Sequence, residues 1–152
     1  MTTTILFDFS RVLLHPRDPS YTGSIDQLYE RTLHKNFLSY FVLNEALLDF
    51  ITEHKTTKQL SLFSNAKILF DPYIQKRITG LFTQIFSAKK LGVSKKDPSS
   101  YLAIAASLHT APTDILFIDD TKENLIYAHQ AGLQTFHYTS NKSLLHTLHK
   151  IM

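Results

Sequence analysis

The sequence predicts an α/β fold, namely a doubly wound, Rossmann-like parallel sheet with helices on both faces and a small helical cap insertion. Two observations favour this fold. Short apolar runs rich in Ile, Leu and Phe alternate with longer segments whose apolar residues recur at three- and four-residue spacing. The runs are also nearly continuously apolar, which is typical of strands covered on both faces of a parallel sheet. Because 152 residues is an ordinary length for one domain, we expect a single domain over residues 1–152.

Five apolar runs are the expected strands. In chain order they are Thr3–Phe9, Gln59–Phe63, Thr83–Phe86, Asp114–Ile118 and Gln134–Tyr138. The segments between them carry helical stripes, of which the clearest are Leu43, Leu47, Leu48 and Ile51, and then Tyr101, Leu102, Ala105 and Leu108. The stretch from Ser140 onward is expected to form a closing helix.

The segment at about residues 15–42 interrupts this alternation and predicts the cap insertion. It opens with an irregular loop marked by Pro16, Pro19 and Gly23. Helical spacing then predicts about one long helix over Ser24–Tyr40, lying over the sheet edge in place of a helical bundle. Its aromatic side chains offer either a contact surface or ordinary packing of that helix, and packing is the preferred interpretation; they are Tyr21, Tyr29, Phe37, Tyr40 and Phe41.

The composition excludes several classes of protein. There is no cysteine, so disulfides and thiolate metal sites are excluded. Sixteen Lys+Arg against 13 Asp+Glu give a net charge of +3 without a basic block, so nucleic-acid binding is not indicated. No apolar run approaches the roughly 20 residues of a membrane span, and the N-terminal residues lack the pattern of a secretory signal. We therefore expect a cytoplasmic protein that does not bind membranes and is a monomer or homodimer.

Polar residues follow three of the predicted strands at the point where each strand ends. Asp8 closes the first strand, Ser64 and Asn65 follow the second, and the pair Asp119–Asp120 follows the fourth. Carboxyl ends of parallel strands line one edge of a sheet, where such folds bind ligands. Three neighbouring carboxylates repel one another unless a cation is present, and Mg²⁺ is the hard ion that prefers oxygen ligands and shares them with phosphate.

Each of these residues has an ordinary alternative explanation. A polar residue after a strand is often the N-cap of the next helix, so Asp120 or Thr121 could cap one helix and Ser64 another. Lys95 precedes an Asp-Pro pair that opens a helix, where it could pair with a phosphate oxygen or be a solvated surface lysine.

In order and spacing, these residues resemble the four motifs of the haloacid dehalogenase-like (HAD) hydrolase superfamily, over nearly the whole chain. The matching segments are ILFDFSRVLL with Asp8, LSLFSNAK with Ser64, KKDPSSY with Lys95, and ILFIDDTKENLIYAHQAGL with Asp119 and Asp120. The last match is the most specific, because the spacing of Asn124, Ala128 and Gly132 also fits the family.

The resemblance implies a Mg²⁺-dependent phosphatase acting on a phosphorylated substrate of unknown identity. Asp8 would attack the phosphoester to form an aspartyl-phosphate, which water then hydrolyses. The ion would be held by Asp8, Asp119, Asp120 and the backbone carbonyl of Ser10. Phosphate would be bound by Ser64, Asn65 and Lys95, and Lys95 would also steady Asp8.

The chain departs from the family at Ser10, where most of its phosphatases carry a second Asp. That Asp acts as general acid toward the leaving group and later as base for water, help worth about 10²–10⁴-fold in rate. A serine hydroxyl does not supply it at neutral pH. We therefore expect metal and phosphate binding with weakened turnover. Two alternatives stay open: a catalytically degenerate binding protein of the same fold, and a dehalogenase-type hydrolase, which uses its Asp without the second carboxylate.

Overall fold

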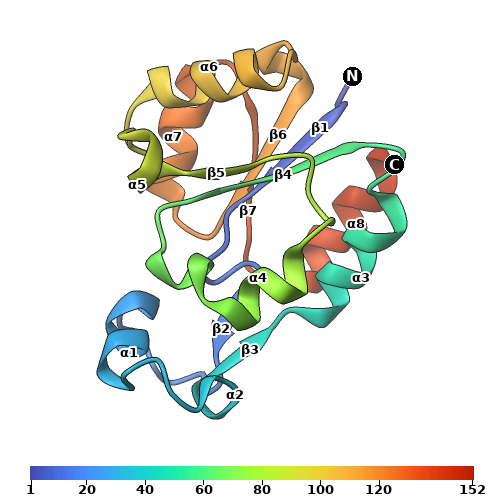
Figure 1. The fold of residues 1–152 in the computed structure, drawn as a ribbon. Helices are drawn as coiled ribbons and strands as arrows, with labels where there is room; N and C mark the ends of the chain where they lie inside the picture. The colour runs from blue at the N-terminus through green and yellow to red at the C-terminus, as the bar shows by residue number, and fades with distance from the viewer.

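The computed structural model describes residues 1–152 and contains a five-stranded parallel sheet (Figure 1). Its strand order is β5-β4-β1-β6-β7. The strands are β1 (Thr4–Phe7), β4 (Gln59–Ser64), β5 (Ile85–Ser87), β6 (Ile115–Asp119) and β7 (Gln134–His137). The chain runs outward from β1 on one side and returns to the other side of β1 for β6. The strand order therefore reverses next to β1, which is where open α/β sheets form a crevice for ligands.

Helices cover both faces of the sheet (Figure 1). One face packs against α3 (Glu45–His54), α4 (Pro72–Ile78) and α8 (Asn141–Ile151), and the other against α5 (Ala88–Leu91), α6 (Pro98–Ser107) and α7 (Lys122–Gln130). Two short 3₁₀ turns complete the layers, η1 (Lys67–Phe70) and η2 (Pro112–Asp114). None of the helices has the length and hydropathy that a membrane crossing requires.

The alternation of side chains along β1 explains the two cores. Ile5 and Phe7 belong to the cluster beneath α3, α4 and α8, whereas Leu6 belongs to the cluster beneath α6 and α7. Successive side chains of a strand point to opposite faces, so a strand covered on both sides must be apolar at every position. The predicted doubly wound α/β fold is confirmed.

The five predicted strands are all present, with ends that shift by up to two residues. The largest shifts are in the first, which ends at Phe7 instead of Phe9, and in the third, which forms over Ile85–Ser87 instead of Thr83–Phe86. The closing helix begins where expected, because the Ser140 hydroxyl accepts a hydrogen bond from the Ser143 amide and caps α8.

The insertion differs from the single long helix expected over Ser24–Tyr40. Ser24 does cap a helix, but α1 (Ile25–Arg31) ends after seven residues, and α2 (Phe37–Tyr40) has only four. Between them the backbone is left-handed at Leu33, His34 and Asn36. An α-helix cannot pass through left-handed residues, so the prediction of one helix is wrong. The flanks pair as a two-stranded antiparallel sheet that the sequence reasoning missed, β2 (Leu14–Pro16) and β3 (Phe41–Leu43).

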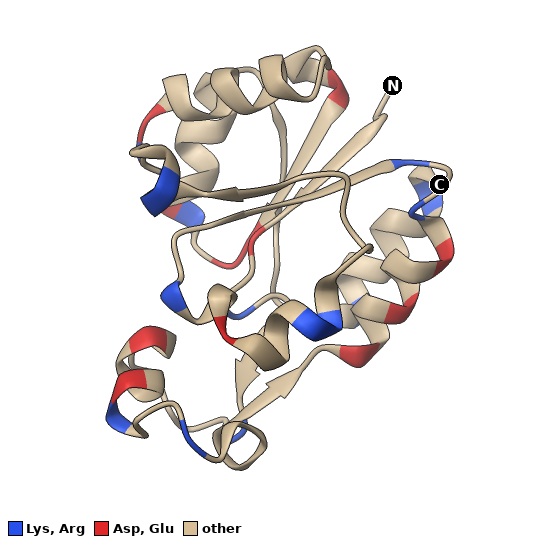
Figure 2. Cartoon of the chain, in the orientation of Figure 1, with Lys and Arg blue, Asp and Glu red and all other residues tan.

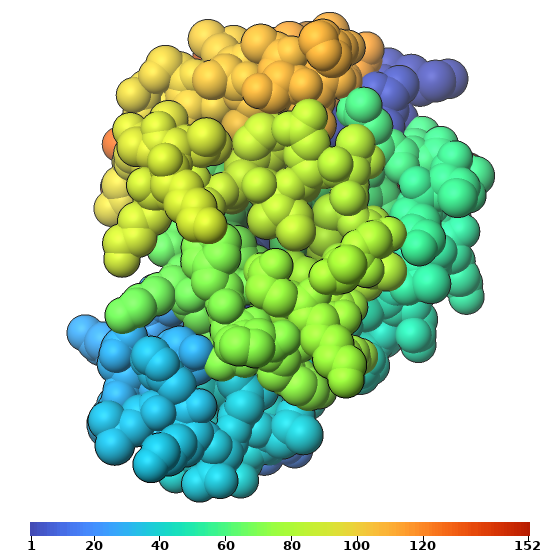
Figure 3. Space-filling view, in the orientation of Figure 1, coloured from blue at the N-terminus to red at the C-terminus, as the bar shows by residue number.

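Aromatic residues fasten the insertion to the main domain. Tyr29 and Phe41 are buried, and the Tyr29 hydroxyl donates to the Asp71 carboxylate at 2.6 Å. The Phe37 ring lies against Tyr73, with 5.1 Å between centroids. The expected packing role holds for these three, while Tyr40 remains 39% exposed. In the space-filling view the insertion, coloured blue to cyan, projects from one end of the molecule (Figure 3).

Candidate active site

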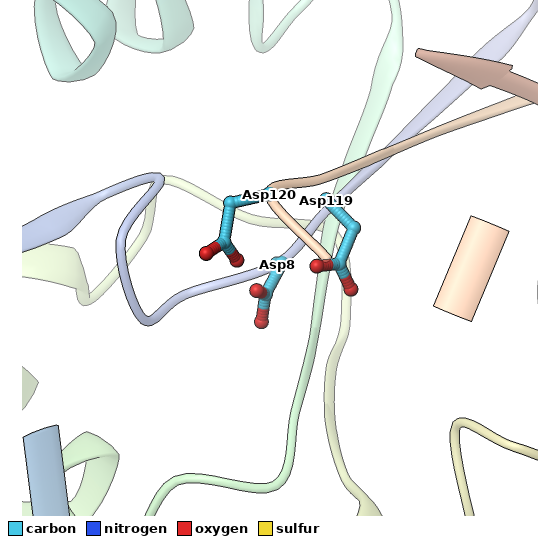
Figure 4. Close-up of side chains that lie close together, drawn as sticks. All are labelled: Asp8, Asp119 and Asp120. Carbon is cyan, nitrogen blue, oxygen red and sulfur yellow. The ribbon is translucent and has the colours of Figure 1, made fainter. Parts of the chain in front are cut away.

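Three carboxylates meet where β1 and β6 end. The strands pair with Phe7 opposite Ile118, and the Asp8 amide donates to the Ile118 carbonyl at 2.8 Å. This register sets Asp8 beside Asp119 and Asp120. One carboxylate oxygen from each residue lies within 4.8 Å of the others (Figure 4). In Figure 2 the red segments at the ends of these strands lie inside the fold, whereas most other charged residues lie on outer helices and turns. The predicted convergence of acidic strand ends is therefore present.

Lys95 lies inside this cluster and is only 3% exposed. Its Nζ donates to Asp8 Oδ1 at 2.5 Å and to Asp119 Oδ2 at 3.2 Å. The alternative of a solvated surface lysine is therefore wrong. Burial disfavours the ammonium, but Asp8 and Asp119 outweigh that effect, so the pKa of Lys95 lies above its usual value. Lys95 is a cation that bridges two of the three carboxylates.

Two local features hold Lys95 in place. Asp97 caps α6 by accepting a hydrogen bond from the Ser99 amide, and Pro98 follows in the first turn. From α6, the buried Tyr101 hydroxyl donates to the Lys95 carbonyl at 2.7 Å. The Asp-Pro turn was visible in the sequence, but the tyrosine contact was not predicted.

The acidic pair divides into an inner and an outer carboxylate. Asp119 is fully buried and accepts from the Thr121 amide at 2.8 Å, the Asn124 side chain at 3.0 Å and Lys95. Asp120 lines the cavity described below, and Asp119 does not. Thr121 occupies the N-cap position of α7 without a side-chain cap bond, and Asp120 does not cap the helix either. Helix capping therefore does not explain these residues.

The cluster carries more negative than positive charge. Burial raises the pKa of Asp8 well above its usual value, against the opposing effect of Lys95, and burial and Asp119 together raise the pKa of Asp120. Three carboxylates thus face one ammonium in a poorly solvated place. All-oxygen donors of this kind suit a hard divalent cation, which would offset the mutual repulsion of the three carboxylates.

The two polar residues at the end of β4, Ser64 and Asn65, differ in their surroundings. Ser64 is 1% exposed, and its hydroxyl accepts a hydrogen bond from the Ala66 amide at 3.0 Å. This bond closes a turn before η1, whose N-cap position is Ala66, so Ser64 does not cap a helix. Asn65 and Ala66 line the cavity, whereas the buried Ser64 does not.

A polar cavity of about 280 Å³ opens over the carboxylates. Of the predicted residues it exposes Asp8, Ser10, Asn65, Lys95 and Asp120. Four others that line it were not predicted as site residues: Arg11, Ser24, Ile25 and Asp26. Only two of its twelve lining residues are apolar, so the cavity favours a small hydrophilic ligand.

Arg11 and Asp26 line the cavity, and contacts between residues far apart in the sequence hold Asp26 there. The Arg11 backbone is left-handed, with φ of 62°, a conformation that costs roughly 1–3 kcal/mol and collects at functional sites. Asp26, from α1, accepts from the amides of Lys67 at 2.8 Å and Ile68 at 3.0 Å. An ion pair between Lys67 and Glu30 strengthens the same contact. The insertion is therefore held against η1, beside the mouth of the cavity.

Comparisons with known proteins find partial sequence matches and full-length structural matches. No protein-family model matches the chain. The chain is 41% identical over 69 residues to an enolase-phosphatase E1 from Enterobacter sp., which is 45% of this chain and 29% of that protein. A second enolase-phosphatase E1, from Methylococcus capsulatus, is 32% identical over 88 residues, or 55% of this chain and 38% of that protein. The chain thus spans well under half the length of these curated relatives.

Solved structures match over nearly the full length. A HAD-family enzyme from Bacteroides thetaiotaomicron, solved with magnesium and inorganic phosphate, has a TM-score of 0.67 at 14% identity and covers 93% of this chain and 96% of its own. A predicted HAD-like hydrolase from Porphyromonas gingivalis has a TM-score of 0.71 at 18% identity, covering 99% and 98%. The chain therefore has the fold of HAD-family enzymes, and the resemblance inferred from the motifs is confirmed.

Proposed function

We propose that the protein is a Mg²⁺-dependent phosphatase that uses Asp8 as its nucleophile. The observation that carries the proposal is the position of the Asp8 carboxylate, which faces the polar cavity with one oxygen on Lys95 and lies within 4.8 Å of two further carboxylates. The similarity to enolase-phosphatases, and the magnesium and phosphate bound to the solved neighbour, support the same chemistry.

Asp8 and Asp120 are the residues that would hold the metal ion directly, together with the Ser10 carbonyl. Both side chains line the cavity, whereas Asp119 is enclosed by Thr121, Asn124 and Lys95. We therefore propose that Asp119 orients Lys95 and contributes charge from behind. When bound, the ion lets an anionic carboxylate approach an anionic phosphate and stabilises the charge that develops on its oxygens.

The chain's own residues then divide the work of phosphoryl transfer. Two hydrogen bonds fix the nucleophile. The Asp8 amide donates to the Ile118 carbonyl, and the Phe9 amide donates to Asp8 Oδ1 at 2.7 Å. The other oxygen, Oδ2, accepts no hydrogen bond from the protein and is the atom for in-line attack on phosphorus. Lys95 and Asn65 line the same cavity and would bind the phosphate oxygens. The P–O bond to the leaving group breaks as the bond to Asp8 forms.

Ser10 gives this reaction a particular kinetic signature. With a hydroxyl where a carboxylate would donate and accept protons, both the departure of a basic leaving group and the attack of water lose about 10²–10⁴-fold. Asp26 does not replace it, since both of its oxygens accept amide hydrogens from η1. We expect fast phosphorylation by esters with good leaving groups, slow hydrolysis, and accumulation of the aspartyl-phosphate.

A second candidate function rests on the same residue. With turnover weakened at Ser10, the protein would bind a phosphorylated ligand through the metal site without consuming it. The dehalogenase alternative is less well supported, because Asp120 at the cavity adds negative charge that a metal-free reaction does not need.

The test is phosphate release from a broad phosphoester panel, with Mg²⁺ or with EDTA. The phosphatase proposal predicts release that needs Mg²⁺, is abolished in Asp8→Asn, and rises in Ser10→Asp. The binding function would be favoured if the wild type binds beryllofluoride but neither the wild type nor Ser10→Asp releases phosphate from any ester. Release of halide from a 2-haloacid in EDTA, with no phosphate release from the panel, would favour the dehalogenase class.

A further inference from the structure

Arg11 is a fixed cation in the wall of the cavity. Its Nη2 donates to the Gly23 carbonyl at 2.5 Å and to the Tyr21 carbonyl at 3.3 Å. These two bonds span the loop that leads into α1, so they hold the guanidinium next to the mouth of the cavity. A guanidinium has five N–H donors, and the two bonds leave those on Nε and Nη1 available.

No carboxylate forms an ion pair with Arg11. The seven ion pairs of the protein do not include it, although Asp8, Asp26 and Asp120 line the same cavity. Asp26 is committed to the amides of η1. Asp8 is paired with Lys95, and Asp120 is a residue that would hold the metal ion. Arg11 is therefore a positioned charge without a direct ion-pair partner, on a strained backbone that the loop contacts maintain.

We propose that Arg11 binds a second anionic group on the substrate, so that the substrate is a small phosphomonoester whose leaving group carries a carboxylate or a second phosphate. This inference rests on the proposed function, because the first phosphate is assigned to the metal ion and Lys95. The cavity of about 280 Å³, with ten of its twelve lining residues polar, leaves room for only a short chain between the two anionic groups. Arginine suits this role because its planar fork matches both carboxylate and phosphate.

The test compares ligands that differ only in this second group. Glycerol 3-phosphate is the reference, 3-phosphoglycerate carries a carboxylate in place of its terminal alcohol, and glycerol 1,3-bisphosphate carries a phosphate there. Titration calorimetry with Mg²⁺, in an Asp8→Asn background that cannot be phosphorylated, gives the dissociation constant of each. One hydrogen-bonded charge pair is expected to make at least one doubly anionic ligand bind about 10- to 100-fold more tightly than the reference.

Arg11→Gln supplies the decisive comparison, with Arg17→Gln as its matched control. Arg17 is also held by backbone carbonyls of the insertion, those of Leu38 and Phe41, but it does not line the cavity. We expect the preference for the second anion to fall to about unity in Arg11→Gln and to persist in Arg17→Gln. The doubly anionic ligand that binds more tightly shows whether the second anionic group is a carboxylate or a phosphate.

Two results would overturn the inference in different ways. Equal affinity for all three ligands in the Asp8→Asn protein, or a preference that survives Arg11→Gln, contradicts the second-anion site and leaves the phosphatase proposal intact. Absence of binding by every ligand in Mg²⁺, in the wild type as well as in Asp8→Asn, contradicts the proposed function and the inference with it.

Discussion

Replacing Lys95 by methionine removes the ammonium that joins Asp8 to Asp119 while keeping a side chain of similar length. At an effective dielectric constant of about 20, charges 2.5 Å and 3.2 Å apart attract by about 7 and 5 kcal/mol. Desolvation of the buried ammonium offsets much of this attraction. What remains is the usual cost of removing one member of a buried ion pair, and we expect the free energy of unfolding to fall by about 3–5 kcal/mol.

Urea denaturation in EDTA at pH 7 measures this loss, and an unchanged m-value shows that the same surface unfolds. The control is Lys96→Met, since Lys96 is the next residue but 59% exposed and paired with Glu123 at the surface, where a pair is worth no more than about 1 kcal/mol. We also expect Mg²⁺ to raise the midpoint of Lys95→Met by more than that of the wild type, because three carboxylates then lack any cation. If Lys95→Met is no less stable than Lys96→Met, the buried cation does not hold the site together.

Three further predictions concern the surroundings of the site. Asp26→Ala removes both hydrogen bonds to η1, so amide hydrogen exchange at residues 67 and 68 should speed up and the free energy of unfolding should fall by about 1–2 kcal/mol. The control is Gln27→Ala, on the exposed side of α1, which should change neither the exchange rates nor the stability. Burial lowers the pKa of His15, whose neutral ring forms a hydrogen bond with the Val12 carbonyl. The folded protein therefore loses stability as the pH falls below 6.5, the pKa of histidine in the unfolded chain. Between pH 7.5 and pH 5.5 the free energy of unfolding should fall less in His15→Gln than in the wild type, and an equal fall would contradict the assignment. Tyr101→Phe frees the Lys95 carbonyl from its hydroxyl partner, so kcat should fall with KM nearly unchanged; a fold-wide loss of stability with normal kcat would mean the tyrosine only packs.

The sheet could be predicted because each strand is a continuous apolar run that is recognisable in the sequence. A strand such as β6, buried on both faces, must be apolar at every position, and the polar residues that follow it then mark its carboxyl end. Asp8, Asp119 and Asp120 could be assigned to one edge for this reason. Their division into an inner and an outer carboxylate could not, because it depends on Asn124 and Lys95 arriving from other elements.

The insertion was harder to predict because its shape comes from distant contacts. The helical spacing continues past Arg31, yet the chain turns there and Tyr29 bonds to Asp71, 42 residues away. The role of Arg11 depends likewise on carbonyls of a loop ten and twelve residues further on. No periodicity in the sequence reports such contacts.

The proposed mechanism requires that Asp8 is phosphorylated and that Ser10 slows the release of its phosphate. Acid quenching during turnover, followed by borohydride reduction and peptide mass spectrometry, measures this directly, because reduction converts an aspartyl-phosphate into homoserine. We predict homoserine at position 8 in the presence of Mg²⁺ and a phosphoester with a good leaving group, a lower amount in Ser10→Asp, and none in EDTA. Phosphate release that continues without modification of Asp8, or that persists in Asp8→Asn, would contradict the account.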